Sequence, residues 1–376
     1  MKCEDLWEIF KKENITFFSG VPDSTFKDWM KLLNDKHGIG LTNIIACNEC
    51  EAIATITGHH LATKNIGVAY MQNSGLGKTI NPLTSLCDKE VYSIPLILMV
   101  GWRGKPGEKD EPQHKKMGEI TLSLLDILNI PYRILPKDVS KAKDIIIEMK
   151  NKTLETNSPV ALIISKGIFE EYQFEKDIKT NYEMNREEAI KIITNELNEK
   201  DIIISTTGKT SRELFEHRIE KKELPRDFYT VGSMGCSASI ANGIALQKPG
   251  KNIFIFDGDG AIIMQMGSLA TIGSYKSKNL YHIIFDNSSY DSTGGQPSNS
   301  SHLSFEEIAL SCGYKATQTI KTKEELVYSI RKLKEKKGPQ LLVIKVNKGA
   351  RKDLGRPTTT PIENKKTFMD FLDETN

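Results

Sequence analysis

The stretch KNIFIFDGDGAIIMQMGSLATIGSYKSKNLYHIIFDN, residues 251–287, decides the fold. It begins with a buried-strand pattern over residues 252–257 and turns at the glycine-rich segment DGDG, residues 257–260. A helical pattern over 262–275 and a second apolar strand pattern over 280–287 follow. Near-continuous apolar strands joined through a helix are typical of parallel sheets that are covered on both faces. This stretch therefore predicts an α/β fold with parallel strands.

The same alternation of short apolar strands and longer helices extends along the whole chain. In the first half we expect strands at residues 15–20, 43–47, 66–72, 95–102, 132–135 and 159–166. In the second half we expect strands at residues 201–208, 228–233, 252–257, 280–287, 316–320 and 340–347. Helical patterns, such as residues 49–62 and 186–199, fill most of the intervals. The sequence predicts an α/β protein with two doubly wound parallel-sheet domains of similar size.

A polar stretch separates the two halves. Residues 169–184 are predicted to be the linker between a first domain, 1–168, and a second domain, 185–350. The C-terminal tail, 351–376, begins with a segment rich in Gly, Pro, Thr and basic residues. Such a segment is typical of an irregular loop, and it is suited to closing over a site.

Composition and charge restrict the class of protein. The 376 residues carry a formal net charge of +2, which gives no overall electrostatic footprint for nucleic acid or an anionic membrane. The longest apolar runs, residues 95–100 and 160–164, are far shorter than the ~20 residues that span a bilayer. The N-terminus lacks the apolar region of a signal peptide, and the six scattered cysteines suit reduced thiols. We expect a cytoplasmic protein that binds neither nucleic acid nor a membrane.

The DGDG turn has the features of an anion and metal site. Glycines at a strand-to-helix turn let the backbone approach a phosphate, and the start of the following helix favours negative charge. Asp259 lies in this turn, and Asp286 and Asn287 end the next strand. Adjacent parallel strands end at one edge of a sheet, so these side chains can converge on one ligand. Carboxylate and amide oxygens suit a hard cation such as Mg²⁺.

The GDG turn, followed by an asparagine at the next strand end, resembles the fingerprint of the thiamine-diphosphate-dependent decarboxylases. The resemblance implies a pyrimidine-binding first domain, a diphosphate-binding second domain and no middle domain. It also implies thiamine diphosphate and Mg²⁺ as cofactors. The metal ligands would be the Asp259 carboxylate, the Asn287 side chain and the Ser289 carbonyl. The family usually has Asn-Asn where this chain has Asp286 and Asn287.

Further cofactor contacts are implied by the same resemblance. In GSMG, residues 232–235, the Gly232 carbonyl would meet the 4′-amino group of the cofactor, and Met234 would wedge under the cofactor and bend it. Without the resemblance, a methionine between glycines is more often a packing residue. The remaining cofactor-binding residues that the resemblance implies are Thr207, Gly208, Gly258, Gly260 and Ala261.

The catalytic carboxylate is expected in the segment NECEAIATITG, residues 48–58. Thiamine decarboxylases carry N-E-x-x-A-x-x-A-x-x-G at this place, and the chain matches it except for Thr55. The resemblance assigns Glu49 the protonation of the cofactor's N1′, which produces the tautomer that activates the thiazolium. An acidic residue in a first helical turn also stabilises the helix dipole without any catalytic role. Glu51, two positions later, lies roughly on the opposite side of the helix.

Long segments resemble one branch of this superfamily, the phosphonopyruvate decarboxylases. They are GVPDS (20–24), NSGLGKTINPLTSL (73–86), GWRGKPGEKDEPQH (101–114), TTGKTSREL (206–214), DSTGGQPS (291–298) and RKDLGRPTTTPIEN (351–364). The resemblance implies a carboxy-lyase that converts 3-phosphonopyruvate to phosphonoacetaldehyde and CO₂, in phosphonate biosynthesis. Cations and hydroxyls suit such an anionic substrate. The candidates are Ser24, Asn73, Arg103, Lys105, His114, Lys209, Arg351 and Arg356.

Other functions stay open at this point. A sulfopyruvate decarboxylase shares the chemistry and differs in the anionic group of its substrate. A P-loop nucleotide-binding enzyme is suggested by GKT at 77–79 and 208–210, but the glycine required earlier in that motif is replaced by Gln72 and Ile203. A catalytically inactive thiamine-binding protein is a third alternative, against which Glu49 and the metal motif argue.

Glu49 lies in the first half of the chain, whereas Asp259 and Asn287 lie in the second. One cofactor must contact both halves. In the superfamily that the chain resembles, the two halves that meet at a cofactor come from different subunits. We therefore expect a homo-oligomer, at least a dimer, with sites shared between subunits and with a small molecule as the substrate.

Overall fold

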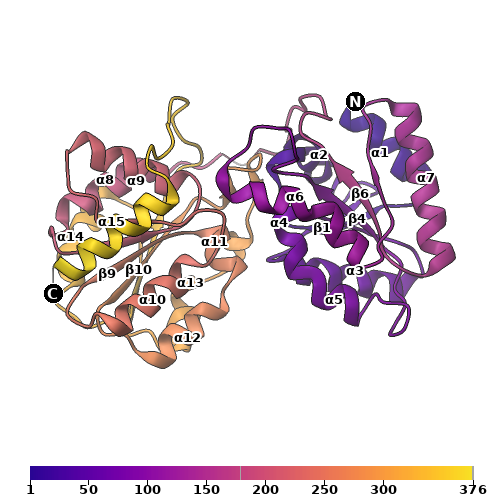
Figure 1. Ribbon diagram of the computed structural model, residues 1–376. Helices are drawn as coiled ribbons and strands as arrows, with labels where there is room; N and C mark the ends of the chain where they lie inside the picture. The colour runs from indigo at the N-terminus through magenta and orange to yellow at the C-terminus, as the bar shows by residue number, and fades with distance from the viewer. Residues whose placement is uncertain (178, 375–376) are drawn as a thin grey trace. The chain divides into compact units, whose positions relative to one another are not determined.

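The computed structural model describes residues 1–177 and 179–374, the last of these without its side chain. Residue 178 of the predicted linker and residues 375–376 of the predicted tail lie outside the described residues. The chain divides into two compact units (Figure 1). The first unit comprises Met1–Asp177 and Ser292–Gln296, and the second comprises Ile178–Asp291 and Pro297–Asn376. Each unit has one six-stranded sheet, and the expected α/β class with two parallel-sheet domains is confirmed.

The sheet of the first unit has the strand order β2-β1-β3-β4-β6-β5, and neighbouring strands run parallel. Its strands are β1 (Phe17–Gly20), β2 (Thr42–Ile45), β3 (Val68–Gln72), β4 (Ile97–Gly101), β5 (Tyr132–Ile134) and β6 (Val160–Ile164). All six overlap the expected ranges. The strand order reverses between β1 and β3, as in other doubly wound sheets.

Helices cover both faces of this sheet. They are α1 (Cys3–Lys12), η1 (Ser24–Phe26), α2 (Lys27–Lys36), α3 (Glu49–Thr63), α4 (Asn73–Leu76), η2 (Gly77–Thr79), α5 (Ile80–Ser85), α6 (Pro112–Ile127) and α7 (Val139–Thr156). Val68 and Tyr70 of β3 pack into a core with α1, α2 and α7. Ala69 and Met71, which alternate with them, pack into a second core with α3, α5 and α6. Because both faces are covered, the inner strands β4 and β6 are apolar and buried along their whole length.

The second unit repeats this arrangement. Its sheet has the order β13-β14-β10-β9-β7-β8, again with parallel neighbours. Its strands are β7 (Ile202–Ser205), β8 (Phe228–Tyr229), β9 (Ile253–Gly258), β10 (Leu280–Asp286), β13 (Ala316–Ile320) and β14 (Gln340–Lys345). Two short strands, β11 (Ser289–Tyr290) and β12 (Gln296–Pro297), lie outside this sheet. Numbered without them, the second sheet has the same order as the first, and it reverses between β7 and β9.

The helices of the second unit also lie on both faces of its sheet. They are α8 (Arg186–Glu196), α9 (Lys209–Glu220), α10 (Ser237–Gln247), α11 (Asp259–Met264), α12 (Gly267–Tyr275), η3 (Asn299–His302), α13 (Phe305–Cys312), α14 (Lys323–Leu333) and α15 (Pro361–Glu374). Side chains of α8, α9 and α14 share one core with the sheet, whereas α10, α12 and α13 lie on the other face (Figure 1). Across residues 1–177 and 179–374, no helix combines the length and apolar character that crossing a membrane requires.

The single helix expected over residues 262–275 is wrong in detail. The chain forms two helices here, α11 and α12, because Gln265 has φ −130° and ψ 42°, which are not helical. Gly267 begins α12, and glycine is a poor residue for a helix interior. The interruption leaves α11 as a short helix directly after the DGDG turn.

The predicted linker, residues 169–184, has hydrogen bonds to both units. The Glu175 N–H donates to Asp35 of the first unit at 2.9 Å. The Tyr182 N–H donates to Asn347 Oδ1 of the second unit at 2.8 Å. Side-chain oxygens of the two units thus hold the linker backbone in place, although few apolar side chains among the described linker residues are buried.

The predicted tail is irregular only in its first part. Arg212 of α9 donates to the carbonyl of Gly355 in this irregular segment. The helix α15 follows, and its Asn364 side chain accepts a hydrogen bond from the Tyr229 N–H at 3.2 Å. This helix was not predicted, because the turn-forming residues before it dominate the local sequence pattern.

Candidate active site

The glycine turns of the second unit lie where its strand order reverses. Thr207 and Gly208 follow β7, whereas Gly258, Gly260 and Ala261 end β9 or begin α11. Because β7 and β9 are paired in parallel, these turns share the carboxyl edge of the sheet. In open α/β sheets, ligands bind at such a reversal. The structure therefore brings these five predicted cofactor-binding residues to one edge of the sheet.

The backbone packs closely around these turns. Gly260 lies against the ring of Tyr290, where an added Cβ would come within 2.5 Å of a ring carbon, so only glycine fits. The Gly232 N–H donates to Thr207 Oγ1 at 3.3 Å, which joins the GSMG loop to the turn after β7. Met234 in this loop is half-buried. Gly232 and Met234 are thus presented beside the same strand ends, and their cofactor contacts remain predictions.

Asp259 is a buried carboxylate, only 4% exposed, and it accepts a hydrogen bond from Ser298 Oγ. The register of β9 and β10 pairs Gly258 with Phe285, which places Asp286 alongside Asp259. Burial, and then the negative charge of Asp286, raise the pKa of the Asp259 carboxyl well above its usual range. A divalent cation would supply the missing compensation, so this donor fits a Mg²⁺ site.

The surroundings of Asp286 show why an aspartate is tolerated where the family usually has the first asparagine of an Asn-Asn pair. It is fully buried, and its register partner on β14 is Lys345, whose Nζ forms an ion pair with it. Its Oδ1 accepts hydrogen bonds from Ser300 Oγ at 2.8 Å and from the Ser288 N–H at 3.0 Å. Asp286 is therefore compensated within the protein, which agrees with the expectation that Asn287 and not Asp286 is the candidate ligand.

Asn287 and Ser289 are buried just after β10. Asn287 Oδ1 accepts from the Ser289 N–H at 3.0 Å, and its Nδ2 donates to Asp291 Oδ2 at 2.8 Å. Among residues 1–177 and 179–374, no cluster of three or more His, Cys, Asp or Glu side chains could hold a metal. A cation at this edge would therefore depend on the mixed oxygen set of Asp259, Asn287 and the Ser289 carbonyl, which Mg²⁺ accepts.

In the first unit, Glu49 is the first residue of α3, and its side chain is only 7% exposed. Lys78 Nζ lies 3.4 Å from Glu49 Oε2. An added Cβ at Gly75 would fall 2.3 Å from Glu49 Oε1, so the glycine leaves room for this carboxylate. Glu51, in contrast, is exposed, and its Oε2 accepts from the Cys47 N–H at 2.8 Å. Glu49 is the buried acid, whereas Glu51 caps the helix.

Three predicted substrate residues, Ser24, Asn73 and Arg103, come together at the carboxyl edge of the first sheet. They follow β1, β3 and β4, which are adjacent strands. Arg103 Nη1 donates to Ser24 Oγ at 3.0 Å. Asn73 Nδ2 donates to the Arg103 carbonyl at 2.8 Å, and its Oδ1 accepts from the Arg103 N–H at 3.3 Å. This cluster lies at the reversal of the first sheet.

Arg103 has a protein carboxylate as its main partner. Its Nε and Nη2 donate to the two oxygens of Asp110 at 2.7 and 2.5 Å. These hydrogen bonds lower the pKa of Asp110 to about 2. His114 is buried nearby, and burial followed by the charge of Arg103 lowers its pKa. Lys105 pairs with Glu108 at 3.3 Å. Arg103 is thus held firmly, with Nη1 directed to Ser24.

The other three substrate candidates belong to the second unit. Lys209 Nζ lies 3.5 Å from the Asp291 carbonyl, and burial lowers the pKa of this ammonium group. Arg356 is exposed and lines a hollow of about 350 Å³ beside α9. Arg351 forms ion pairs with three carboxylates, namely Glu187, Glu216 and Asp353. Because Glu187 lies in α8 and Glu216 in α9, Arg351 fastens the tail to these helices.

Asp23 was not among the candidates, although it lies next to Ser24. It is 0% exposed, and Gln72 Nε2 donates to its Oδ1 at 2.5 Å. Burial raises the pKa of Asp23, and the hydrogen bond from Gln72 and the charge of Arg103 oppose this increase. The signal available in the sequence was an aspartate shortly after an apolar strand, within GVPDS. A buried carboxylate at the reversal point is a functional candidate.

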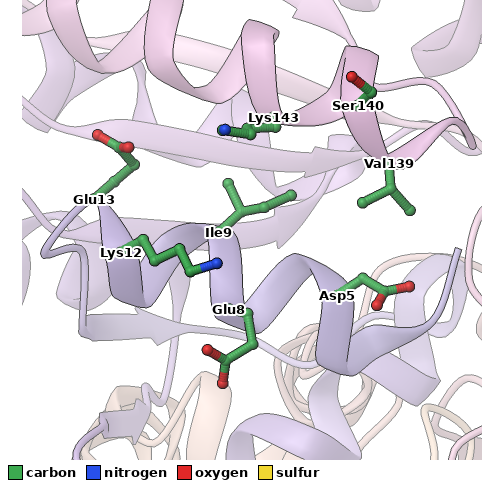
Figure 2. A pocket seen from close by; sticks show the side chains of 8 residues that line it. All are labelled: Asp5, Glu8, Ile9, Lys12, Glu13, Val139, Ser140 and Lys143. Carbon is green, nitrogen blue, oxygen red and sulfur yellow. The ribbon is translucent and has the colours of Figure 1, made fainter.

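A hollow of about 560 Å³ lies between α1 and α7 of the first unit (Figure 2). Asp5, Glu8 and Lys12 line it from α1, and Val139 and Lys143 line it from α7. No predicted site residue lines it. It lies between two helices that cover one sheet face and not at the reversal of the strand order, so we do not assign the active site to it.

Comparisons with known proteins identify the family of the chain. Residues 3–124 match the N-terminal TPP binding domain of thiamine pyrophosphate enzymes, and residues 206–344 match the C-terminal TPP binding domain. The chain is 32% identical to a phosphonopyruvate decarboxylase of Streptomyces viridochromogenes, over 95% of this chain and 91% of the relative. It is 31% identical to a phosphonopyruvate decarboxylase of Streptomyces hygroscopicus, over 96% of this chain and 91% of the relative.

A more distant relative is a sulfopyruvate decarboxylase of Methanosarcina acetivorans, 26% identical over 98% of this chain and 97% of the relative. All three relatives are decarboxylases, and their similarity extends over both units. The matched domains account for thiamine diphosphate as the cofactor and for carboxy-lyase activity. The chain therefore belongs to the thiamine pyrophosphate enzymes, in the decarboxylase family that includes the phosphonopyruvate decarboxylases.

Proposed function

We propose that this chain decarboxylates 3-phosphonopyruvate to phosphonoacetaldehyde and CO₂, with thiamine diphosphate and Mg²⁺, as a step of phosphonate biosynthesis. The observation that carries the choice of substrate is the full-length similarity to two phosphonopyruvate decarboxylases, at 32% and 31% identity. The identity to the sulfopyruvate decarboxylase is lower, at 26%. Phosphonopyruvate is therefore the first choice, and sulfopyruvate is the second.

The proposed roles follow the two strand-order reversals. Residues 1–168 would be the pyrimidine-binding domain, joined through 169–184 to the diphosphate-binding domain 185–350, with 351–376 as a tail that closes over the site. Asp259, Asn287 and the Ser289 carbonyl would hold Mg²⁺ against the diphosphate, which the glycine turns approach through their backbone. Thiamine diphosphate, when bound, supplies the electron sink for the bond that breaks as CO₂ leaves.

The chain's own groups would supply proton transfer and anion binding. Glu49, buried at the start of α3, would hold or release the proton at the cofactor's N1′. Arg103, held by Asp110, would direct a hydrogen-bond donor toward a substrate oxyanion beside Ser24. Burial of Glu49 excludes water and strengthens the electrostatic interactions of its carboxyl group.

A substrate panel tests this proposal. CO₂ release is measured from phosphonopyruvate, sulfopyruvate and pyruvate, with and without thiamine diphosphate and Mg²⁺. We expect the highest kcat/KM for phosphonopyruvate and no turnover when either cofactor is omitted. A higher kcat/KM for sulfopyruvate would replace the substrate assignment, and turnover without thiamine diphosphate would refute the cofactor roles.

Replacement of the candidate arginines tests the anion site. Removing a charged hydrogen-bonding partner from a desolvated anion costs ~2–5 kcal/mol. We expect kcat/KM for phosphonopyruvate to fall roughly 30-fold or more in at least one of Arg103→Ala, Arg351→Ala and Arg356→Ala. Arg103 is the first choice because it contacts Ser24. The loss for pyruvate should be smaller if the missing contact was to the phosphonate.

Arg133→Ala is the matched control for this series. Arg133 also pairs with a carboxylate, Glu148, but both side chains are about half exposed. Arg133 lies on β5, an edge strand that is not at the reversal between β1 and β3. We expect Arg133→Ala to leave the kinetics unchanged. Unchanged phosphonopyruvate kinetics in all three candidate variants would place the phosphonate site elsewhere.

We further propose that the protein is a cytoplasmic homo-oligomer, at least a dimer, whose sites combine Glu49 of one subunit with Asp259 and Asn287 of another. Mixing Glu49→Gln and Asp259→Ala chains, after dissociation and reassembly, tests this arrangement. Random pairing makes half of the dimers mixed, and each mixed dimer would have one intact site of two, so activity should return to about a quarter of wild type. Proven subunit exchange without any regained activity would mean that each site is formed within one chain.

A further inference from the structure

The geometry behind Asn287 points to one further residue of the metal site. We propose that Asp291 is a positioning residue that orients the Asn287 amide so that its Oδ1 is presented to the divalent cation. This inference rests on the proposed Mg²⁺ site. Asp291 is the first residue of the DSTGG segment, and none of the roles described above requires its side chain.

The hydrogen bond to Asp291 orients the side-chain amide of Asn287. Asn287 Nδ2 donates to Asp291 Oδ2 at 2.8 Å, and the Gly349 N–H donates to the same oxygen at 3.0 Å. The Asp291 side chain is only 9% exposed. An ionised carboxylate accepts hydrogen bonds but donates none, so only the NH₂ end of the amide can face it. The carbonyl end, Oδ1, therefore faces away from Asp291. It accepts one hydrogen bond, from the Ser289 N–H at 3.0 Å, and its second lone pair can serve a metal as a hard oxygen ligand.

Asp291 is held in place by a buried cation. Arg186 Nη1 lies 3.6 Å from Asp291 Oδ2, and the Arg186 side chain is only 7% exposed. Arg186 is fixed in turn by a bidentate contact with Glu213, at 2.7 Å from Nε and 2.8 Å from Nη2. Paired forks of this kind are geometrically specific. Glu213 thus fixes Arg186, Arg186 fixes Asp291, and Asp291 fixes the side chain of Asn287.

Outer partners of metal ligands are important because they reduce the freedom of the ligand before the metal arrives. Loss of such a partner typically costs 10- to 100-fold in metal affinity. In Asp291→Ala the Asn287 amide keeps the hydrogen bond from the Ser289 N–H but loses the acceptor of its Nδ2, so it is held less firmly. We therefore expect Mg²⁺ to bind about 10- to 100-fold more weakly. In Asp291→Asn the amide oxygen can still accept from Asn287, so we expect a loss of about fivefold or less.

The experiment is a calorimetric titration of Mg²⁺ into the full-length protein at saturating thiamine diphosphate, with thermal melting to confirm folding. The variants are Asp291→Ala, Asp291→Asn and Asn287→Ala. The control is Asp227→Asn, which alters another buried carboxylate of the second unit, bound to Arg218 at 2.7 Å. We expect Asp227→Asn to affect the melting temperature but not the Mg²⁺ affinity.

Each outcome decides one statement. Unchanged Mg²⁺ affinity in Asn287→Ala overturns the proposed metal site itself. Weaker binding in Asn287→Ala together with wild-type affinity in Asp291→Ala overturns only the positioning role. If Asp291→Ala does not fold, Asp291→Asn decides: a loss as large as that of Asn287→Ala overturns the role of the hydrogen bond, whereas near-wild-type affinity supports it.

Discussion

Glu49→Gln is expected to lower kcat for phosphonopyruvate by about 100- to 10,000-fold, the usual range for removal of a general acid or base. Glutamine keeps the shape of the side chain but cannot hold or release a proton. Glutamine fills the same buried space, but it removes the negative charge that lies 3.4 Å from Lys78 Nζ. The measurement is single-turnover CO₂ release at saturating thiamine diphosphate, so that weaker cofactor binding does not imitate a chemical defect.

Glu51→Gln is the control for this prediction. Glu51 is exposed and accepts a hydrogen bond from the Cys47 N–H, which glutamine can still accept through its amide oxygen. We therefore expect near-wild-type turnover from Glu51→Gln. Comparable losses in both variants would show that the segment matters only for the stability of α3. Near-wild-type turnover of Glu49→Gln would refute the catalytic assignment.

Much of the fold could be predicted because burial on both faces of a parallel sheet leaves a plain sequence signal. β4 and β6 are apolar throughout, because every residue of these two strands is buried under helices on one face or the other. The break at Gln265 could not be predicted, because the apolar period continues through both α11 and α12. The helix α15 could not be predicted either, because turn-forming residues precede it and its anchor to Tyr229 is a contact distant in sequence.

The candidate site shows the same division. Glu49 and Asp259 could be proposed from motifs, because each motif places its residue directly at a strand end or helix start. Their partners could not be proposed in this way. Lys345 compensates Asp286 only because β10 and β14 are neighbours in a particular register. Asp110 binds Arg103 through a loop whose path no local pattern specifies. Pairing of charges is therefore a property of the tertiary structure.

The second large effect is expected at Asp259. Asp259→Ala removes the one carboxylate of the proposed metal set and leaves the charge of the diphosphate without its bridge. Breaking a buried ionic contact costs ~3–5 kcal/mol. We therefore expect the Mg²⁺-dependent affinity for thiamine diphosphate to fall roughly 100-fold or more. Calorimetric titration of the cofactor with and without Mg²⁺ measures this difference.

The same substitution should have the opposite effect on the protein without cofactor. Burial and Asp286 raise the pKa of Asp259, so the native state disfavours the ionised form. Between the unfolded and the raised native pKa, the native state binds more protons, and stability decreases as the pH rises. Above that window, Asp259→Ala should therefore melt at the same or a higher temperature than wild type. Asp259→Asn, which keeps an acceptor for Ser298, should be intermediate in cofactor affinity. A wild-type cofactor affinity in Asp259→Ala would refute its role as a metal ligand. A large loss of stability without cofactor would show that Asp259 stabilises the fold.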